Sequence, residues 1–441
     1  MPDSSALNFL DELAWRGLLH QTTSPELAAH LASGSRTGYC GFDPTSDSLT
    51  VGNLLPVTLL RRFQAAGHRP IALLGGGTGL IGDPSGKTSE RSLQSEAQVT
   101  ANLAGQRRIL ERLLEVDGPC GAVFVDNAEW LRGLGYLEVL RDVGKHFSVN
   151  AMIQRDSVAS RLEGREHGIS YTEFSYMVLQ AYDFLHLYRS HGCTVQMGGS
   201  DQFGNIVSGI DLVRRMHAIE HGEGSTESLA FGVTAPLLTA ADGSKIGKTE
   251  KGAVWLSAER TSPYRFHQFW LNVADADAGR FLRWYTMLPR EAIEAIEAEQ
   301  AAKPQERSAQ RTLAAEMTDL VHGRSERQRA EAAAAALFSG DVRSLDAASL
   351  AEISEDLPAS DHAIASLDGD GADLVETLVA AGLAKSKREA REFVASGAVS
   401  INGEKAEAER RLRRGDLLDA NGRGVILLRR GRKQWHATRW A

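Results

Sequence analysis

Three polar side chains recur at helical spacing in the segment Tyr171–Leu187. Tyr176, Gln180 and Asp183 stand at positions i, i+4 and i+7, so a helix would place them on one stripe. A solvated helix face carries Lys or Glu more often than this set. Polar groups that converge on a pocket need hydrogen-bond partners, and a zwitterionic ligand would supply them. The stripe therefore indicates a small-molecule site, with a solvated helix face as the alternative.

A second set of chemically useful residues lies in Tyr39–Leu54, between a predicted first strand and a helix start. Glycine in this segment lets a ligand ring approach the backbone closely. The hydroxyls of Thr45 and Thr50, beside free N–H groups of the helix, can hold a polyphosphate because the positive end of the helix dipole favours anions. A capped helix without a ligand is the alternative interpretation.

Two further segments offer groups for a nucleotide. Gln196–Asn205 follows a predicted strand, and open α/β sheets bind ligands at the carboxyl ends of their strands, where Asp201 could take ribose hydroxyls. Asp242–Thr249 carries Lys245 and Lys248 in a Gly-containing loop, so both lysines can neutralise a polyphosphate as the loop moves. Taken alone, such a lysine pair is usually solvated charge.

The Gly-rich segment Gly75–Gly82 imitates two other nucleotide sites. It contains a G-x-G-x-x-G pattern, which would indicate a dinucleotide site in a nicotinamide oxidoreductase. That fingerprint needs a helix start behind the glycines, whereas Asp83–Gly86 would break a helix. Gly86 and Lys87 resemble the end of a phosphate loop, but Ile81 stands where that loop needs its first glycine. Both interpretations are therefore disfavoured.

The elements that must position these residues follow an alternating pattern. From about Tyr39 to Val233, short apolar runs alternate with longer amphipathic stretches, which predicts a parallel sheet with helices on its faces. From Ser262 to Leu337 the strand signals vanish and Ala, Glu, Arg and Leu predict helices. The clearest strands are Ile71–Leu74, Ala122–Val125 and Thr194–Met197, and the clearest helices are 54–66 and 173–187.

The charge of the chain changes sign near its end. Residues 345–371 are rich in Ala, Ser and Asp with little periodicity, which predicts a linker. Beyond it, residues 371–441 hold 15 Lys and Arg against 9 Asp and Glu, which gives this segment a charge of +6. Because the whole chain carries −8, residues 1–370 carry −14. An acidic body with a basic tail predicts that the tail attracts nucleic acid.

Length and composition fit a protein of several globular domains. The chain has 441 residues, of which 42% are hydrophobic and 24% are charged, so a disordered or collagen-like chain is excluded. Its three cysteines are too few and too widely spaced for a disulfide framework or a four-ligand zinc site, which fits a reducing compartment. Asp11 and Glu12 stand where a signal peptide would carry positive charge, and no stretch has the 18 or so apolar residues that a membrane span needs. We expect a cytoplasmic protein with no membrane partner.

The order of these motifs resembles that of the bacterial tyrosyl-tRNA synthetases, a family of class I aminoacyl-tRNA synthetases. Tyr39–Leu54 stands where the family has its HIGH-type signature, and Leu74–Leu93 resembles its Gly-rich stretch through GDPSGK and SER. Gly198–Asn205 resembles GGSDQWGN, and Ser244–Thr249, with the sequence SKIGKT, occupies the KMSKS position. The resemblance covers nearly the whole chain. It implies a tyrosine–tRNA ligase that uses L-tyrosine, ATP with Mg²⁺ and tRNA(Tyr), with no tightly bound cofactor and no metal site made by the protein.

The resemblance also implies a role for each matching residue. The residues expected to bind tyrosine are Tyr39 and Asp183 at the phenol, Asp83, Tyr176 and Gln180 at the ammonium, and Gln202 near the carboxylate. Those expected to contact ATP are Gly41, Asp43, Gly52, Gly199, Asp201 and Lys248. Those expected to act in catalysis, chiefly on the leaving pyrophosphate, are Thr45, Thr50, Asn53, Lys87, Arg91, Lys245, Lys248 and Thr249.

The chain departs from the family pattern at the signature. Thr50 and Asn53 replace both histidines of the usual H-x-G-H. Asparagine can still donate a hydrogen bond, whereas Thr50 is shorter than imidazole and would reach phosphate through water. Phe203 replaces the usual tryptophan of GGSDQWGN, which keeps an aromatic wall and removes one N–H donor.

The tail resembles a small RNA-binding domain shared with a ribosomal protein of the small subunit. The resemblance rests on Ala384–Arg391, Gly397–Gly403 and Gly415–Asp416. Independently, a Lys/Arg-bearing helix, an Asn-Gly hairpin turn and Arg429–Lys433 offer phosphate contacts, and Trp435 and Trp440 offer stacking surfaces. We therefore expect tRNA, and not DNA, as the nucleic-acid partner.

The expected fold is an α/β, Rossmann-like parallel-sheet catalytic domain, followed by a helical domain and a small α+β RNA-binding C-terminal domain. The expected segments are the catalytic domain with a helical insertion at 1–235, a mobile KMSKS-type loop region at 236–260, a helical anticodon-arm domain at 261–345, a linker at 346–370 and the basic domain at 371–441. The family implies a homodimer, with 118–165 as a candidate interface. Two alternatives stay open: a tryptophanyl-type synthetase, and a catalytically silent RNA-binding protein with a synthetase-like body.

Overall fold

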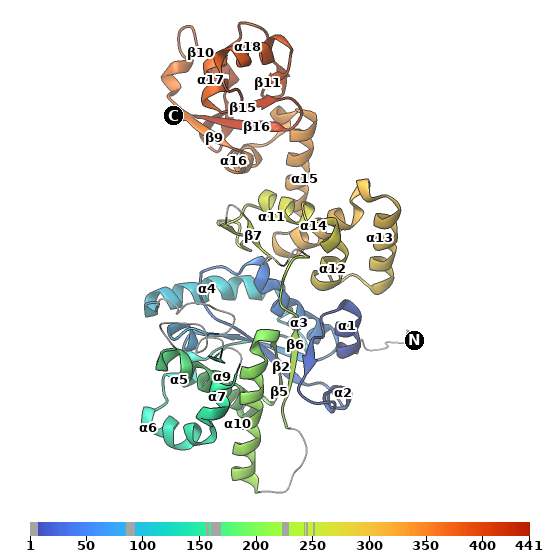
Figure 1. Ribbon diagram of the computed structural model, residues 1–441, viewed down its shortest axis with the longest axis vertical. Coiled ribbons are helices and arrows are strands. Elements are labelled where there is room, and N and C mark those ends of the chain that lie inside the picture. The colour runs from blue at the N-terminus through green and yellow to red at the C-terminus, as the bar shows by residue number, and fades with distance from the viewer. Residues whose placement is uncertain are drawn as a thin grey trace. The chain divides into compact units, whose positions relative to one another are not determined.

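The chain divides into two compact units, which are described separately. The computed structural model describes residues 8–84, 93–155, 158–159, 169–222, 229–241, 243, 246–249 and 252–441. The first unit comprises Met1–Ser257 with Val273–Leu313, and the second comprises Ala258–Asn272 with Ala314–Ala441. Figure 1 follows the elements from the N-terminus in blue to the C-terminus in red.

A six-stranded sheet forms the centre of the first unit. Its order is β1-β6-β5-β2-β3-β4, and all neighbours are parallel except β1 and β6. Because β3 and β4 follow β2 on one side while β5 and β6 lie on the other, the strand order reverses between β2 and β5, the place where such sheets bind ligands. The three predicted strands are confirmed as β3, β4 and β5. The bounds are β1 Gln21–Thr22, β2 Thr37–Phe42, β3 Arg69–Leu74, β4 Val123–Asp126, β5 Cys193–Gly199 and β6 Phe231–Ala235.

Helices cover both faces of this sheet. A Cβ on Gly38 of β2 would lie 2.9 Å from the ring of Phe63 in α3, whereas the ring of the next residue, Tyr39, lies 5.4 Å from that of Phe184 in α9. Successive strand residues point to opposite faces, so α3 and α9 cover opposite faces. The two predicted helices are confirmed as α3 and α9. The bounds in this region are α1 Phe9–Arg16, α2 Leu27–Ala32, α3 Leu54–Ala65, α4 Glu96–Leu113, α5 Ala128–Leu131, α6 Tyr136–Glu138, α7 Val149–Ile153, α9 Tyr171–His191 and α10 Phe203–His221.

Two buried arginines tie a later helix, α12 (Asp275–Tyr285), to the sheet unit. Arg62 of α3 donates to the carbonyl oxygens of Thr286 at 2.7 Å and Arg283 at 3.1 Å, and Arg16 of α1 donates to the same two oxygens. Carbonyls at a helix C-terminus lack partners within the helix, so these guanidinium groups satisfy them. The helix α13 (Arg290–Ala302) follows in the same unit.

The helical region predicted from Ser262 to Leu337 is confirmed, but it is shared between the units. The helices α11 (Pro263–Leu271) and α15 (Arg324–Ser339) pack on each other in the second unit, and α14 (Ser308–Val321) belongs to both units. The expected helical segment 261–345 is therefore divided, because α12 and α13 belong to the first unit, where α12 packs on α3 and α1. Among the described residues, no helix is long and apolar enough to cross a membrane.

The predicted linker 346–370 is wrong. Its residues form α16 (Ala347–Asp356), which begins at the capping side chain of Asp346, and β9 (Ala359–His362), which pairs in parallel with β16 (Gln434–Trp440). Leu350 and Ile353 are buried. The Ala- and Ser-rich composition hides this short apolar stripe, whose spacing of three residues is that of a helix face.

The C-terminal sheet has the order β12-β11-β15-β16-β9, and β14 also pairs with β15. Asn402 and Gly403 both have positive φ between β11 and β12, which confirms the predicted Asn-Gly hairpin turn. The predicted basic helix is confirmed as α18. The remaining bounds are β10 Ala372–Asp373, α17 Leu374–Ala380, α18 Lys387–Ala395, β11 Val399–Ile401, β12 Glu404–Lys405, β13 Arg411–Leu412, β14 Leu418–Ala420 and β15 Arg423–Arg430.

Candidate active site

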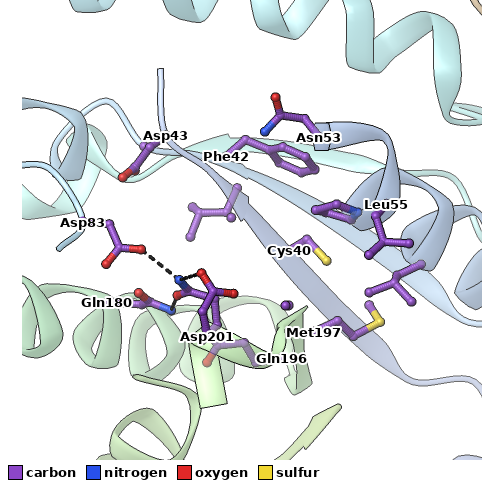
Figure 2. Close-up of a pocket in the computed structure, with 18 of the residues that line it drawn as sticks. Cys40, Phe42, Asp43, Asn53, Leu55, Asp83, Gln180, Gln196, Met197 and Asp201 are labelled. Atoms are coloured by element: carbon purple, nitrogen blue, oxygen red, sulfur yellow. Dashed lines mark hydrogen bonds between the residues drawn. The ribbon is translucent and has the colours of Figure 1, made fainter. Parts of the chain in front are cut away.

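A cavity of about 490 Å³ opens at the carboxyl ends of β2, β3 and β5. Its walls include the strand residues Tyr39–Phe42 and Gln196–Gly199 and the start of α3, so it joins strand segments that lie more than 150 residues apart in the chain. Figure 2 shows Asn53 and Leu55 at the start of α3, while Asp83, Gln180 and Asp201 gather on another side of the pocket.

One end of the cavity is built to bind a hydroxyl group. Asp183 of α9 accepts hydrogen bonds from the side chains of Asn127, with Nδ2 at 2.9 Å from Oδ2, and Trp130, with Nε1 at 2.8 Å from Oδ1. The hydroxyl of Tyr39 is buried and has no hydrogen-bond partner among the described residues. A buried polar atom without a partner is costly, so a ligand hydroxyl placed between Tyr39 and Asp183 would remove that cost.

Burial controls the ionisation of this end. It raises the pKa of the Asp183 carboxyl to about 7, although the hydrogen bonds from Asn127 and Trp130 act in the opposite direction. Burial, and after it the nearby Asp183, also raises the pKa of the Tyr39 phenol well above its ordinary value. Tyr39 therefore stays a neutral hydroxyl that can both donate and accept a hydrogen bond.

A connected set of polar side chains follows along the same helix. The Tyr176 hydroxyl donates to Asp43 Oδ2 at 2.9 Å, and Gln180 Nε2 lies 3.2 Å from Gln202 Oε1. Gln202 Nε2 in turn donates to Asp83 Oδ2 at 2.8 Å. Carboxylates and amide oxygens that converge in this way favour a cationic group, such as the ammonium of an amino acid.

Glycines of the Gly-rich segment lie so close to the carboxylates of Asp43 and Asp126 that a side chain would not fit between them. A Cβ on Gly75 would lie 2.3 Å from Asp43 Oδ1, and one on Gly76 would lie 2.2 Å from Asp126 Oδ1. The segment continues in a short 3₁₀ turn, Thr78–Leu80, whose Thr78 hydroxyl donates to Asp43 Oδ1 at 2.9 Å. In the G-x-G-x-x-G pattern itself, a Cβ on Gly77 would lie 2.9 Å from Leu131 Cδ1 and one on Gly79 would lie 2.7 Å from Pro44 Cγ, so close packing also explains these two glycines.

Known protein families match this chain over most of its length. The model of the class I tRNA synthetases (W and Y) matches residues 33–339, and that of the tyrosine–tRNA ligase SYY-like C-terminal domain matches residues 350–438. The chain is 50% identical to the tyrosine–tRNA ligase of Roseiflexus castenholzii over 98% of this chain and 99% of that protein. It is 48% identical to the tyrosine–tRNA ligase of Geobacillus kaustophilus over 99% of this chain and 100% of that protein.

A solved structure agrees with these matches. The C-terminally truncated mitochondrial tyrosyl-tRNA synthetase of Aspergillus nidulans superimposes with a TM-score of 0.68 at 31% identity, covering 76% of this chain and 96% of that one. This chain belongs to the tyrosyl-tRNA synthetases. The family expected from the motifs is therefore confirmed, and so is the fold class.

The cavity brings together most of the residues that the family resemblance singles out. Twelve of them line it: Tyr39, Gly41, Asp43, Gly52, Asn53, Asp83, Tyr176, Gln180, Asp183, Gly199, Asp201 and Gln202. Thr45 lines a small neighbouring cavity with Asp43, and Asn102 and Gln106 of α4 hold the loop around it through its carbonyls. Thr50 lines neither cavity, and its hydroxyl donates to Asn53.

The cationic candidates of this synthetase stay predictions. Lys87, Arg91 and Lys245 lie outside the described residues. Lys248 and Thr249 form the strand β7, which pairs with β8 (Gly252–Ala253), but their side chains are not described. Before the loop, Asp277 accepts from the backbone N of Ala241 at 3.1 Å, and Arg280 donates to the carbonyl of Thr239 at 2.8 Å. The N-terminal anchor of the loop is therefore fixed on α12.

Several residues that build the cavity or hold Asp183 escaped the sequence patterns. Asn127 and Trp130, which contact Asp183, lie within four residues of the carboxyl end of β4. Because ligands bind at the carboxyl ends of parallel strands, this position was the available signal. Gln196 lies inside β5, where its buried Oε1 has no partner among the described residues and lines the cavity. A polar residue inside an apolar strand run was the available signal.

The expected stacking surfaces of the tail are wrong. Trp435 is 7% exposed and Trp440 is 4% exposed, so neither ring is available to a base. Trp435 packs in the core with Leu427 and donates from Nε1 to the carbonyl of Leu337. An exposed aromatic side chain lies elsewhere in the second unit, since Phe338 near the end of α15 is 89% exposed.

Proposed function

We propose that this chain is a tyrosine–tRNA ligase that selects its substrate through the phenol end of the cavity. One observation carries the proposal. The Tyr39 hydroxyl, which is buried and has no partner among the described residues, and the buried Asp183 carboxylate line the same cavity. Phenylalanine would leave the buried Tyr39 hydroxyl without a partner, at a cost of about 1 to 3 kcal/mol, and would offer Asp183 no hydroxyl to bind. This enzyme family is itself a standard case of discrimination near 10⁵ without editing.

The reaction needs no nucleophile from the protein. The carboxylate of tyrosine attacks the α-phosphate of ATP in line, and the pyrophosphate leaves. The tyrosyl group then passes from the adenylate to the 3′ end of tRNA. Catalysis consists of positioning the two substrates and stabilising the charge of the leaving group. The cavity fits this division, because polar side chains lie at one end and the start of α3, where the positive end of the helix dipole favours anions, lies at another.

We assign the residue roles as the family resemblance implies them. Asp83, Tyr176 and Gln180 hold the ammonium of tyrosine, and Gln202 lies near its carboxylate. The glycines at 41, 52 and 199 let the nucleotide approach the backbone, while Asp43 and Asp201 contact its ribose end. Thr45, Asn53, Lys87, Arg91, Lys245, Lys248 and Thr249 act on the phosphates.

Magnesium would accompany ATP. Within the described ranges, no group of three or more His, Cys, Asp or Glu side chains is arranged to hold a metal ion. Mg²⁺ is commonly bound through substrate phosphates and water with few protein carboxylates. Its contribution here is neutralisation of phosphate charge.

The second unit would hold tRNA. Arg388 on α18 is largely exposed, and exposed Arg432 and Lys433 lie in the turn between β15 and β16. These cations provide phosphate contacts, and Phe338 provides a surface on which an unpaired base can stack. The expected RNA partner therefore keeps its phosphate contacts, while the stacking residue changes.

A homodimer would cover an apolar surface in the first unit. Among the described residues of the expected interface 118–165, the large apolar side chains that are at least two-fifths exposed are Tyr136, Leu137, Leu140, Val149 and Ile153. Contiguous exposed apolar patches mark interaction surfaces, and we infer such a patch on this segment. Light scattering coupled to size exclusion tests the dimer.

We also assign the protein to the cytoplasm, where its three free cysteines would stay reduced.

The test of the function is tyrosine-dependent exchange between ATP and pyrophosphate, with phenylalanine and tryptophan as controls. Exchange with tyrosine alone supports the proposal. Exchange with tryptophan would favour the tryptophanyl alternative. An absence of exchange with all three amino acids would favour a silent RNA-binding protein.

A further inference from the structure

The two residues that replace the signature histidines are bonded to each other. The backbone N of Thr50 lies 2.9 Å from Asn53 Oδ1, and the Thr50 hydroxyl donates to the same oxygen at 2.8 Å. Both bonds close over the 3₁₀ turn Val51–Asn53 that precedes α3, in the manner of a capping box.

These bonds decide which way the Asn53 amide faces. A backbone N–H can only donate, so the amide atom opposite the Thr50 nitrogen must be the oxygen. The second lone pair of that oxygen accepts the Thr50 hydroxyl. The amide nitrogen, with its two hydrogens, is therefore turned away from Thr50.

The backbone that carries the Thr50 N–H is itself held. The N–H of Val51 donates to the carbonyl of Val254 at 3.0 Å, and that of Leu256 donates to the carbonyl of Leu49 at 2.8 Å. The segment after the lysine loop thus pairs with both neighbours of Thr50. The orientation of the Asn53 amide therefore depends on the Thr50 hydroxyl and on a fixed N–H.

Only one member of the pair reaches the cavity. Asn53 lines it, whereas Thr50 does not. The side-chain hydrogen bonds of Asn53 with other described residues involve its Oδ1, and none among the described residues uses its Nδ2. Figure 2 shows the Asn53 amide at the border of the pocket, on the element that starts α3.

We propose that Thr50 is a positioning residue that acts on ATP through Asn53, and that the two residues form one functional unit. Thr50 orients the amide, and the amide donates to the nucleotide. The inference rests on the proposed ATP-dependent activation and deepens it. It also replaces the expectation that Thr50 itself acts on phosphate.

A double-mutant cycle tests the unit. The variants are Thr50→Val, which keeps the side-chain shape and removes the hydroxyl, Asn53→Ala, and the combination of both, all in the full-length chain. Thr50→Val should lower kcat of tyrosine-dependent exchange about 3- to 10-fold, and Asn53→Ala on the order of 10- to 100-fold, with the KM for tyrosine little changed. In the Asn53→Ala background, Thr50→Val should have no further effect.

Two outcomes would overturn the inference. If the two effects multiply in the double variant, Thr50 acts without Asn53. If Thr50→Val leaves kcat unchanged, its hydroxyl does not position the amide. Thr50→Ser restores the hydroxyl and should recover most of the lost rate, which also covers the case in which Thr50→Val does not fold. Thr100→Val, on the exposed side of α4, is the matched control. Absence of exchange in the unaltered protein would refute the proposed function instead.

Discussion

Replacement of Asp183 by asparagine tests two effects of the buried carboxylate: its cost to the stability of the fold and its contribution to the binding of tyrosine. The carboxylate is 2% exposed and accepts hydrogen bonds from Asn127 and Trp130. Asparagine has nearly the same size but carries no charge at any pH. Asp183→Asn should therefore change the pH dependence of stability and the selectivity for tyrosine together.

The size of the stability effect follows from the pKa. Burial raises the pKa of Asp183 to about 7, against an ordinary value of about 3.9 in the unfolded chain. A raised carboxyl pKa means that the folded state binds the proton more tightly, so this group lowers stability as the pH rises from about 4 to about 7. Above the folded pKa the loss is complete. Relative to the unaltered protein, the variant should gain roughly 2 to 3 kcal/mol of unfolding free energy between pH 5 and pH 8.

A second effect of the same substitution does not depend on pH. Asn127 Oδ1 accepts from the N–H of Gly77 at 2.7 Å, so its amide nitrogen is fixed toward residue 183. The indole of Trp130 can only donate. The introduced amide has a single oxygen for these two donors, which costs about 1 to 3 kcal/mol at every pH. The slope with pH is therefore the informative quantity.

Denaturant unfolding of both proteins at pH 5, 6, 7 and 8 measures this slope. Asp117→Asn, at an exposed position after α4, is the control and should leave the slope unchanged. Parallel curves for Asp183→Asn and the unaltered protein would refute the claim that burial raises this pKa. In the exchange assay, the variant should lose discrimination against phenylalanine while its KM for ATP changes little. Intact discrimination would contradict the role of Asp183 at the phenol.

Three further predictions concern the loop and the second unit. Phe338→Ala should lower the rate of tRNA charging about tenfold or more without changing ATP–pyrophosphate exchange, because a base–aromatic stack is worth about 1 to 3 kcal/mol. Phe338→Trp should retain charging. If the alanine variant charges tRNA as fast as the unaltered protein, the stack is excluded. Lys248→Ala should slow tyrosine activation in a burst experiment while tyrosine binding stays the same, so a normal burst would contradict its role on pyrophosphate. Asp277→Ala removes the acceptor for the N–H of Ala241 and should lower kcat of activation severalfold, a net hydrogen bond being worth about 1 kcal/mol, whereas equilibrium dialysis should show unchanged tyrosine affinity.

Local patterns were sufficient for much of the fold. The strands at Ile71–Leu74 and Thr194–Met197 and the helix that carries Tyr176, Gln180 and Asp183 all follow from periodicity, which depends only on neighbours in the chain. The same stripe predicted that three of its side chains share one cavity, and they do. The linker failed because its helix buries only a few apolar residues, so that composition outweighed spacing.

The sequence by itself determined the family, the order of the secondary structure and most of the residues that line the cavity. Only the tertiary structure decided which of these residues touch. Asn127 and Trp130 meet Asp183 from more than 50 residues away, because the sheet order places the end of β4 beside α9. The exposure of Phe338 and the burial of Trp435 likewise depend on packing between distant segments. The physical reason is that periodicity is a local property of the chain, whereas burial and the partners of a polar group are set by segments that only the fold brings together.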